Sequence, residues 1–273
     1  MRPPCKIIAL LTDFGYEDPY VASMKGVALN ICPEVKLIDI THSIPSFDIE
    51  TGAFTLLASY KYFPQGTIFV AVVDPGVGGP RRPLLIVTRN YYFIGPDNGL
   101  LTAAAEDDGI EAVIKIENEL YFRKPLSPSF HGRDVFMPTA AWLACGVAPD
   151  AFGSRQSIES VVRGSISMYI NMVGADCAEV RVLHIDKFGN VILSQRYDSL
   201  ENTLGIKQGD KVYIRCKGAE YEARVAKVFS VVNEKQLVLY KDSFDLAELA
   251  VNKGSAKDLM GVRKGDSIII CRK

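Results

Sequence analysis

The chain has 273 residues, of which 48% are hydrophobic and 23% charged, and it carries a formal net charge of -1. This length accommodates one large domain or two modest ones with an ample apolar core. A nearly neutral chain gives no reason to expect nucleic acid or an anionic membrane as its main partner. The apolar run near the amino terminus is too short for a signal peptide or a membrane anchor, so we expect a cytoplasmic protein.

Six cysteines are scattered along the chain, with no C-x-x-C pair and no histidines at metal-ligand spacing. This scatter argues against a disulfide framework and against a structural zinc site. We therefore expect no metal in the protein. The cysteines are Cys5, Cys32, Cys145, Cys177, Cys216 and Cys271.

The N-terminal part of the chain alternates short apolar runs with helical patterns. Asp18 and Pro19 predict the start of the first helix, as N-cap and first helical residue, and Pro33 ends it. Asp48 can cap the second helix. The order strand, helix, strand, helix, strand implies a parallel sheet with right-handed crossovers. The expected strands are Lys6–Leu11, Val35–Ile40 and Thr67–Val73, and the helices run to about Ile31 and Tyr60.

The third strand leads into the most informative stretch, Val70–Arg82, which reads VAVVDPGVGGPRR. The strand stops at Asp74, a glycine-rich turn follows, and Arg81 and Arg82 close the stretch. The carboxyl ends of parallel strands share one edge of a sheet, so Asp13, which follows the first strand, is expected near Asp74. Taken alone, the stretch fits equally well a capped turn with solvated arginines.

The glycine-rich turn does not match the dinucleotide fingerprint, because it lacks the G-x-G-x-x-G spacing and precedes a hairpin instead of a helix. A nicotinamide cofactor is therefore not expected. Beyond the turn at Gly95–Gly99, a polar loop around His131 leads into a helix with the single tryptophan, and residues 147–168 read as irregular. The predicted elements are the hairpin Leu84–Val87 and Tyr91–Ile94, helix Leu100–Glu106, strand Ala112–Ile116 and helix Val135–Cys145.

The last third of the chain consists of short β-type runs separated by turn residues, which predicts a small antiparallel barrel or sandwich. Helical turns are expected near Leu246–Leu249 and Ala256–Met260. The fold class is therefore α/β, with an N-terminal, mostly parallel, open-sheet (Rossmann-like) domain over residues 1–168 and a smaller C-terminal antiparallel β-barrel domain over residues 169–273. The predicted strands are Glu179–Ile185, Val191–Leu193, Lys211–Cys216, Ala219–Val228, Gln236–Tyr240 and Ser267–Cys271.

Six motifs occur along the chain in the order found in one known family, and the resemblance to that family covers essentially the whole chain. On these motifs the sequence resembles the S-adenosyl-L-methionine (SAM) hydroxide adenosyltransferases, which share their fold with the bacterial fluorinase and chlorinase. The resemblance implies hydrolysis of SAM by water or hydroxide attack at C5′, giving adenosine and L-methionine with no cofactor. It also implies a homotrimer whose sites lie between the N-terminal domain of one chain and the C-terminal domain of the next. The motifs are LTDFG (11–15), DITHSIPSFDIETGA (39–53), FPQGTIFVAVVDPGVG (63–78), GPDNGLL (95–101), FHGRD (130–134) and DKFGNV (186–191).

The resemblance also assigns roles to residues of the N-terminal domain. Asp74, Arg81 and His131 match the family's Asp-Arg-His triad, which positions and activates the attacking water or hydroxide. Asp13 matches the carboxylate that binds the ribose hydroxyls. Phe47 stands where related enzymes place an aromatic ring against the ribose and the sulfonium.

In the C-terminal domain the resemblance implies the contacts with methionine and adenine. Asp186 and Asn190 match the polar pair that holds the amino-acid end of methionine, and Phe188 matches the ring that stacks on adenine. The family often has glycine where Phe244 stands, so this wall of the site differs here. The remaining methionine and adenine contacts match Ser243 and the backbone of Asn252–Ser255, which includes Gly254 and Ser255.

Elementary chemistry agrees with these roles. Displacement at C5′ needs a nucleophile opposite the sulfur, and methionine leaves as a neutral thioether without help from an acid. The site must hold an oxygen nucleophile in line and exclude bulk water. An Asp/His pair can accept the proton and an arginine can stabilise hydroxide-like charge. His42 and His184 read as structural histidines.

Three alternatives stay open. A halogenase of the same fold would use a halide, but a carboxylate at position 74 repels an anion, and the halogenating relatives carry neutral residues where Asp74 and Gly132 stand. A non-catalytic binder of SAM or adenosine would return its ligand uncleaved. Arg82 competes with Arg81 as the functional arginine; Arg81 is preferred because its offset from Asp74 matches the family.

Overall fold

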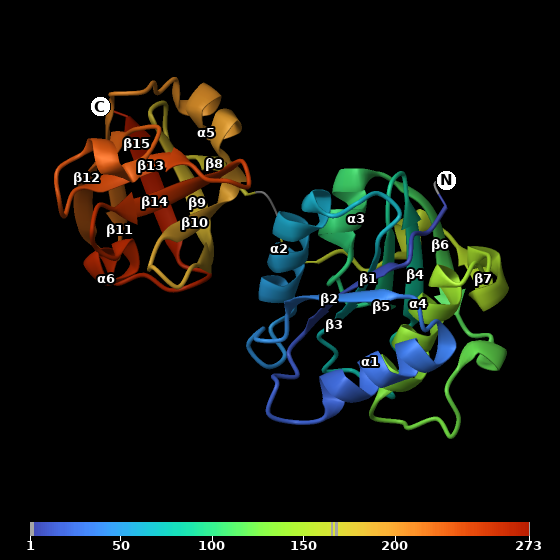
Figure 1. The fold of residues 1–273 in the computed structure, drawn as a ribbon. Coiled ribbons are helices and arrows are strands. Elements are labelled where there is room, and N and C mark those ends of the chain that lie inside the picture. The colour runs from blue at the N-terminus through green and yellow to red at the C-terminus, as the bar shows by residue number, and fades with distance from the viewer. Residues whose placement is uncertain (1–2, 165, 167–168, 273) are drawn as a thin grey trace. The chain divides into compact units, whose positions relative to one another are not determined.

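The computed structural model describes residues 3–164, 166 and 169–272 and contains two compact units, Met1–Ser165 and Ile166–Lys273 (Figure 1). Each unit has its own sheet and its own apolar core, so each is described by itself. The domain boundary predicted after residue 168 falls among residues 165, 167 and 168, which lie outside the described residues.

The first unit is built on a seven-stranded sheet in the order β2-β1-β3-β5-β4-β6-β7. The strands β2, β1, β3 and β5 are parallel, whereas β4, β6 and β7 pair antiparallel with their neighbours. The open α/β sheet predicted from the sequence is confirmed, and its parallel half is the half that ends at Asp13 and Asp74. The strands are β1 (Ile7–Thr12), β2 (Lys36–Thr41), β3 (Ile68–Val72), β4 (Pro83–Thr88), β5 (Tyr92–Pro96), β6 (Ile110–Ile116) and β7 (Gly153–Gln156).

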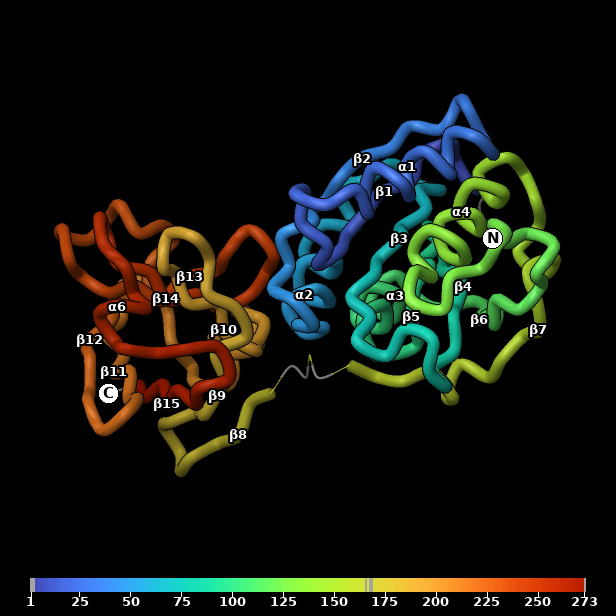
Figure 2. The backbone as a smooth tube through the Cα atoms, turned by 90° about the horizontal axis from the view of Figure 1, so that it is seen from below, coloured from blue at the N-terminus to red at the C-terminus, as the bar shows by residue number. Residues whose placement is uncertain are grey.

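Helices cover both faces of this sheet (Figures 1 and 2). On one face α1 and α4 pack side by side, and the alternate strand residues Ile8 and Leu10 point into the same apolar cluster. On the other face α2 packs against α3, and Leu11 lies near Gly52 of α2. The helices are α1 (Tyr20–Ile31), α2 (Ile49–Ser59), α3 (Thr102–Asp108) and α4 (Met137–Ala144), the last preceded by a π-helical turn, Gly132–Phe136; short 3-10 turns are Tyr60–Tyr62, Glu119–Tyr121, Pro149–Phe152 and Ile158–Ser160.

Two helix starts test the capping predictions. Asp48 caps α2 as predicted, since its carboxylate accepts a hydrogen bond from the backbone N–H of Thr51 at 3.0 Å. The prediction for α1 is wrong, because this helix begins at Tyr20 with Pro19 at its cap and no side-chain cap. The region predicted as irregular also contributes the edge strand β7.

The connection from β3 to β4 is the feature of the sheet that matters for the site. β5 lies between these two strands, parallel to β3 and antiparallel to β4. Residues 73–82 therefore pass over the carboxyl end of β5 and return on its other side. We call this segment the arch, and both Asp74 and Arg81 belong to it.

The second unit is a β-barrel in which seven strands close through the pairing of β9 with β10, and β8 extends the sheet beside β9. All neighbouring strands are antiparallel except β12 and β13. The predicted barrel is confirmed. Its strands are β8 (Asn171–Met172), β9 (Cys177–Ile185), β10 (Val191–Arg196), β11 (Lys211–Cys216), β12 (Ala219–Val225), β13 (Leu237–Lys241), β14 (Leu246–Val251) and β15 (Ser267–Arg272); its helices are α5 (Tyr197–Leu204) and α6 (Ala256–Met260), with a 3-10 turn at Phe229–Val231.

One helical turn predicted in this unit is wrong and the other is confirmed. Residues 246–249 belong to strand β14, where Leu249 and Ala247 fill the barrel core, whereas Ala256–Met260 is helix α6. No helix among residues 3–164, 166 and 169–272 is long and apolar enough to span a membrane.

The prediction that the cysteines form no disulfides is wrong. Cys32, at the end of α1, is bonded to Cys145, at the end of α4, and Cys177 on β9 is bonded to Cys271 on β15. The partners are 113 and 94 residues apart in the sequence, so their spacing gives no signal. Helix packing brings the first pair together, and the second pair lies directly opposite on neighbouring strands.

Candidate active site

The candidate site of the first unit lies at the carboxyl edge of the parallel strands. Thr12, the last residue of β1, lies opposite Val72, the last residue of β3. Asp13 and the arch therefore leave the sheet side by side. This is the convergence that the order of the strands predicts.

Asp74 and Arg81 form an ion pair across the arch. The Nε atom of Arg81 donates to both carboxylate oxygens of Asp74 at 3.0 Å, and Nη2 donates to Oδ2. The side chains of Asp74 and Arg81 are 5% and 10% exposed. The guanidinium also lies over the ring of Phe136, 5.3 Å from its centroid. Two points of attachment and a ring beneath hold the planar guanidinium in one orientation.

His131 completes the cluster through the same guanidinium. Nη2 of Arg81 lies 3.0 Å from Nδ1 of His131. Because a guanidinium can only donate, Nδ1 is the acceptor, and the proton of the neutral imidazole then lies on Nε2. Burial and the charge of Arg81 lower the pKa of His131, while Asp74 and Asp134 act in the opposite direction. The imidazole is therefore neutral at pH 7.

A buried carboxylate holds the loop that carries His131. Asp134 is fully buried and accepts hydrogen bonds from Arg133 at 2.6 Å and from the backbone N–H of Ser127 at 2.8 Å. Its pKa is lowered because these donors outweigh the cost of burial. At Gly78, which has φ +75°, a Cβ atom would lie 2.5 Å from the carbonyl oxygen of Pro128, so the arch and this loop touch at a glycine.

Asp13 and Phe47, predicted as substrate contacts, are joined to each other. The carboxylate of Asp13 accepts a hydrogen bond from the backbone N–H of Phe47 at 2.9 Å. Phe47 has φ +68°, an uncommon conformation for a bulky residue, and the residue is 69% exposed. The bond to Asp13 thus helps to hold an aromatic ring outward at the edge of the site.

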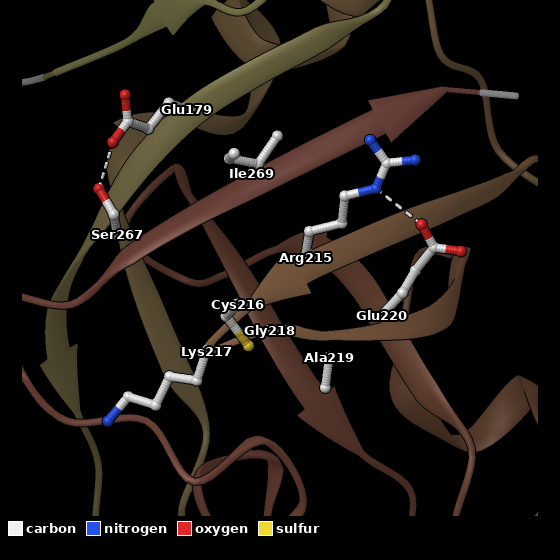
Figure 3. Close-up of a pocket in the computed structure, with 9 residues that line it drawn as sticks. All are labelled: Glu179, Arg215, Cys216, Lys217, Gly218, Ala219, Glu220, Ser267 and Ile269. Carbon is white, nitrogen blue, oxygen red and sulfur yellow. Dashed lines mark hydrogen bonds and ion pairs between the residues drawn. The ribbon is translucent and has the colours of Figure 1, made fainter.

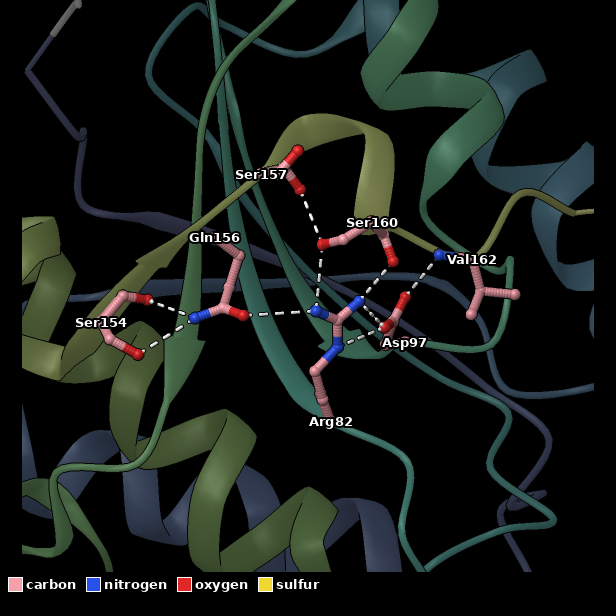
Figure 4. Close-up of polar contacts among 7 residues, drawn as sticks. All are labelled: Arg82, Asp97, Ser154, Gln156, Ser157, Ser160 and Val162. Carbon is pink, nitrogen blue, oxygen red and sulfur yellow. Dashed lines mark hydrogen bonds and ion pairs between the residues drawn. The ribbon is translucent and has the colours of Figure 1, made fainter.

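His42 is a structural residue, as predicted. It is buried, with Nδ1 2.7 Å from the hydroxyl of Thr12 and Nε2 3.0 Å from the carboxylate of Asp39. Its ring therefore links the ends of β1 and β2. Arg82 does not contact the cluster either, because its guanidinium pairs with Asp97 at the end of β5 (Figure 4).

In the second unit, the loop between β9 and β10 is a compact turn stabilised by its own polar groups. Oδ1 of Asp186 accepts from the backbone N–H groups of Phe188 and Asn190 at 2.9 Å, and Oδ2 accepts from the side-chain amide of Asn190 at 3.0 Å. Phe188 is 66% exposed, and the ammonium of Lys187 lies 4.8 Å from the centroid of its ring. The turn therefore presents an aromatic face outward.

The structure brings Ser255 to this turn. The backbone N–H of Lys257 donates to the carbonyl of Gly189 at 2.9 Å, and a Cβ atom at Gly189 would lie 2.2 Å from the Ser255 hydroxyl. That hydroxyl caps α6. Asn252 has a local role, since its side-chain amide donates to the carbonyl of Val232 at 2.7 Å.

Sequence reasoning missed two polar residues near Asp186, namely Glu248 and Tyr240. Glu248 on β14 is 5% exposed and accepts a hydrogen bond from the hydroxyl of Tyr240 on β13. Burial, followed by the charges of Asp242 and Asp186, raises the pKa of Glu248 to about 7. A glutamate within the apolar run LAELAV was the available signal.

Ser243 lies in the turn that follows β13. In this turn the carboxylate of Asp242 accepts hydrogen bonds from the backbone N–H groups of Phe244 and Leu246.

A separate cavity of about 450 Å³ lies on the barrel surface and contains none of the predicted site residues (Figure 3). Its polar side chains are already paired, Arg215 with Glu220 at 2.7 Å and Ser267 with Glu179. We assign it no role in the reaction. It is lined by Glu179, Arg215, Cys216, Lys217, Gly218, Ala219, Glu220, Ser267 and Ile269.

Comparisons with known proteins cover both units. Residues 8–153 match the family model described as the SAM hydroxide adenosyltransferase N-terminal domain, and residues 180–269 match the corresponding C-terminal domain. An (R)-S-adenosyl-L-methionine hydrolase of Thermus thermophilus is 34% identical over 272 residues, covering 97% of this chain and 98% of that protein.

A more distant relative and a solved structure are also similar to this chain. A fluorinase of Nocardia brasiliensis is 27% identical and covers 96% of this chain and 95% of its own. The crystal structure of an uncharacterized conserved protein from Thermotoga maritima superposes with a TM-score of 0.91 at 36% identity, over 97% of this chain and 100% of that one.

Proposed function

Because the chain belongs to the SAM hydroxide adenosyltransferase family, we propose that it hydrolyses SAM to adenosine and L-methionine. The observation that supports this function is the nearly buried Asp74–Arg81–His131 cluster at the carboxyl edge of the sheet. It joins a carboxylate, a fixed cation and a neutral imidazole, which are the groups that attack by an oxygen nucleophile requires.

The reaction forms a bond between the oxygen and C5′ and breaks the bond between C5′ and sulfur. The electron pair of that bond stays on sulfur, so methionine leaves as a neutral thioether. Arg81 stabilises the developing hydroxide charge, and the Nε2–H group of His131 orients the oxygen by donating to it, since Nδ1 is used by Arg81. Asp74 accepts the proton of the attacking water. No metal or organic cofactor takes part in the proposed step.

A halogenase is the second reaction class that this fold serves. Its nucleophile would be a halide, which must approach the place where Asp74 lies. A carboxylate with 5% of its side chain exposed repels an anion there and suits water. The lower identity with the fluorinase agrees with hydrolysis.

The experiment that tests the function uses heavy-oxygen water. Purified protein is incubated with SAM and a chelator, without nicotinamide, and products are measured by mass spectrometry. We expect adenosine carrying the label in its 5′-hydroxyl, together with methionine. A 5′-halide or methylthioadenosine as the main product would refute hydrolysis, and ligand recovered intact would indicate a binding protein.

We also propose how the substrate is held. Asp13 binds the ribose hydroxyls and Phe47 covers the ribose and sulfonium. In the second unit Phe188 stacks on adenine, Asp186 and Asn190 hold the amino-acid end of methionine, and Ser243, Asn252, Gly254 and Ser255 supply the other contacts. The support is the exposed ring of Phe188 above a preformed turn, with Ser255 beside it.

The proposed assembly is a homotrimer in which each site takes its halves from two chains. Mixing inactive Asp74→Ala chains with inactive Asn190→Ala chains after dissociation should restore part of the activity, because some interfaces then contain both intact halves. Each variant dissociated and reassembled alone is the control. Light scattering measures the mass, and absence of recovery in mixed trimers would contradict shared sites.

The cytoplasmic location stays a prediction. Disulfides such as Cys32–Cys145 and Cys177–Cys271 are typical of oxidising compartments and of the interior of hyperthermophiles. Cell fractionation combined with thiol titration of freshly lysed cells would decide the location and the state of the cysteines together.

A further inference from the structure

The arch that contains Asp74 and Arg81 is fastened at both ends to consecutive residues of one turn. Before Asp74, the carbonyl of Val73 accepts a hydrogen bond from the side-chain amide of Asn98 at 2.8 Å. After Arg81, the Nε atom of Arg82 donates to the carboxylate of Asp97 at 2.7 Å. The attachment points therefore stand one residue outside each member of the ion pair.

These attachments follow from the order of the strands. β5 ends at Pro96, between β3 and β4, so Asp97 and Asn98 lie beneath the arch. The backbone N–H of Asp97 donates to the carbonyl of Arg82 at 2.9 Å, which adds a main-chain bond to the side-chain pair. The side chain of Asp97 is 3% exposed, so the pair with Arg82 is shielded from solvent on the carboxylate side.

A second set of contacts fixes Arg82 and Asp97 themselves (Figure 4). The guanidinium of Arg82 donates to the carbonyl of Ser160 at 2.6 Å and to the side chain of Gln156 at 3.3 Å. The other carboxylate oxygen of Asp97 accepts from the backbone N–H of Val162 at 2.9 Å. The donors of this guanidinium are shared among the carboxylate of Asp97, the carbonyl and hydroxyl of Ser160 and the side chain of Gln156, which leaves little freedom for residue 82.

We propose that Arg82, Asp97 and Asn98 are positioning residues for the reaction, because they fix the backbone on both sides of the Asp74–Arg81 pair. Displacing a catalytic group by about 1 Å can cost about 10²-fold in rate. Arg81 is also the group that holds Nδ1 of His131. Release of the arch therefore changes both the alignment of the carboxylate and the surroundings of the imidazole.

Asp97→Asn and Arg82→Met test the second attachment, and Arg82→Lys is the conservative variant. Asn98→Asp tests the first attachment; it keeps the oxygen that accepts from Leu100 and loses the donor to Val73. The matched control is Arg163→Gln, which removes an exposed ion pair with Glu106 near the same segment. Arg163 makes no described contact with the arch.

The first readout is steady-state kinetics with SAM. We expect kcat to fall by about 10–100-fold in Asp97→Asn, Arg82→Met and Asn98→Asp, with KM changed by less than about threefold. Arg82→Lys should recover part of the loss because a single ammonium can still pair with Asp97. A residue that only supports folding would lower the melting temperature and leave kcat per folded molecule unchanged.

The second readout is titration of His131 by NMR, which is practical because the chain has three histidines. The groups that face this imidazole are Arg81, Asp74 and Asp134. Release of Arg81 and entry of water should raise the pKa of His131 toward its usual value of about 6.5 in the variants. Arg163→Gln should leave the titration unchanged.

The two readouts separate this inference, which rests on the proposed function, from the function itself. If the wild type does not cleave SAM, the function is wrong, and the titration still reports on the arch. If kcat and the His131 titration match the control in the variants, the positioning role is wrong. Should Asp97→Asn not fold, Asn98→Asp decides, since it changes one side-chain atom and no buried charge pair.

Discussion

The two units of the protein prepare their candidate site residues in different ways. In the first unit, charged side chains bind one another: Arg81 joins Asp74 and His131 in a nearly buried cluster. In the second unit, Asp186 and Asn190 bind the loop on which they stand, and the ring of Phe188 points outward. Fixed charges suit the stabilisation of a transition state, whereas a shaped turn with an exposed ring suits recognition.

This contrast predicts that changes in the charged cluster of the first unit affect the chemical step, whereas changes in the turn of the second unit affect affinity. Asp74→Asn should give the largest effect. It keeps the shape of the side chain and removes its charge, so we expect kcat for SAM hydrolysis to fall by about 10²–10⁴-fold, the usual contribution of a positioned base. Adenosine affinity, measured by calorimetry, should change little. Asp150→Asn, an exposed carboxylate paired with Arg155, is the control.

The same variant can contradict the roles assigned to the two units. Full activity in Asp74→Asn would show that the carboxylate only forms the arch. A loss of adenosine affinity without a loss of kcat would make Asp74 a binding residue instead of the base. In the double variant Asp74→Asn with His131→Ala, the loss should be much smaller than the product of the single losses, because the cluster acts as one unit.

Glu248 is a buried carboxyl group of the second unit, and its substitution should give the next largest effect. Its pKa is raised from 4.5 to about 7, so the folded chain binds a proton that the unfolded chain releases. The contribution of Glu248 to the free energy of unfolding is therefore largest below pH 4.5, and it is lost as the pH rises through about 7. Between pH 5 and pH 8 the free energy of unfolding should fall by about 2–3 kcal/mol more in the wild type than in Glu248→Gln.

Urea unfolding at each pH measures this difference. Glu222→Gln is the matched control, because Glu222 is an exposed glutamate of the same barrel, paired with Lys211. The control should keep the pH dependence of the wild type. Equal pH dependence in Glu248→Gln and the wild type would mean that Glu248 is ionised in the folded chain at neutral pH.

Phe188→Ala should affect affinity and leave the chemical step intact. Loss of one stacked ring costs about 1–3 kcal/mol when a base is bound, so adenosine should bind about tenfold or more weakly. The rate at saturating SAM should stay within about twofold, because the variant removes no group of the charged cluster. Phe229→Ala, another exposed ring of the barrel, is the control. A fall in kcat with unchanged affinity would reverse the roles given to the two units.

The smallest effect concerns pH. The lowered pKa of His131 keeps the imidazole neutral, and a proton on Nδ1 would face the guanidinium of Arg81. Activity should therefore fall as the pH drops through that pKa. Since the pKa lies below about 6.5, the rate at pH 6 should be within about threefold of the rate at pH 7. A steeper loss over this interval would mean that another group controls the reaction.

Much of the first unit could be predicted from the sequence, because strand order and strand ends follow from local patterns. The apolar run before Asp74 and the turn after it predicted the edge of the sheet, and resemblance supplied Arg81 and His131. Their mutual contact depends on the loop around Asp134, which folds back to the arch over a long sequence separation. Local patterns carry no information on such contacts.

The wrong predictions also concern contacts between residues that are far apart in the sequence. The disulfides join residues that are remote in the sequence. The helical turn predicted near Leu246–Leu249 is part of strand β14 instead, and the neighbouring strands bury Glu248 beside Tyr240. Arg82 and Arg81 are adjacent and chemically identical, so only the structure shows that one faces His131 and the other Asp97.

The insertion of β5 beneath the arch has a consequence for how such a site can vary during evolution. The arch must cross two strand spacings, about 9.6 Å, and still return Arg81 to Asp74. Substitutions within residues 75–80 are therefore expected to be tolerated except at Gly78, whose Cβ would lie 2.5 Å from the carbonyl oxygen of Pro128, and at Gly79, whose Cβ would lie 3.1 Å from that of Gly76. Insertions or deletions of a single residue in the same segment are not, because they would move Arg81 out of register with a carboxylate whose place the sheet determines.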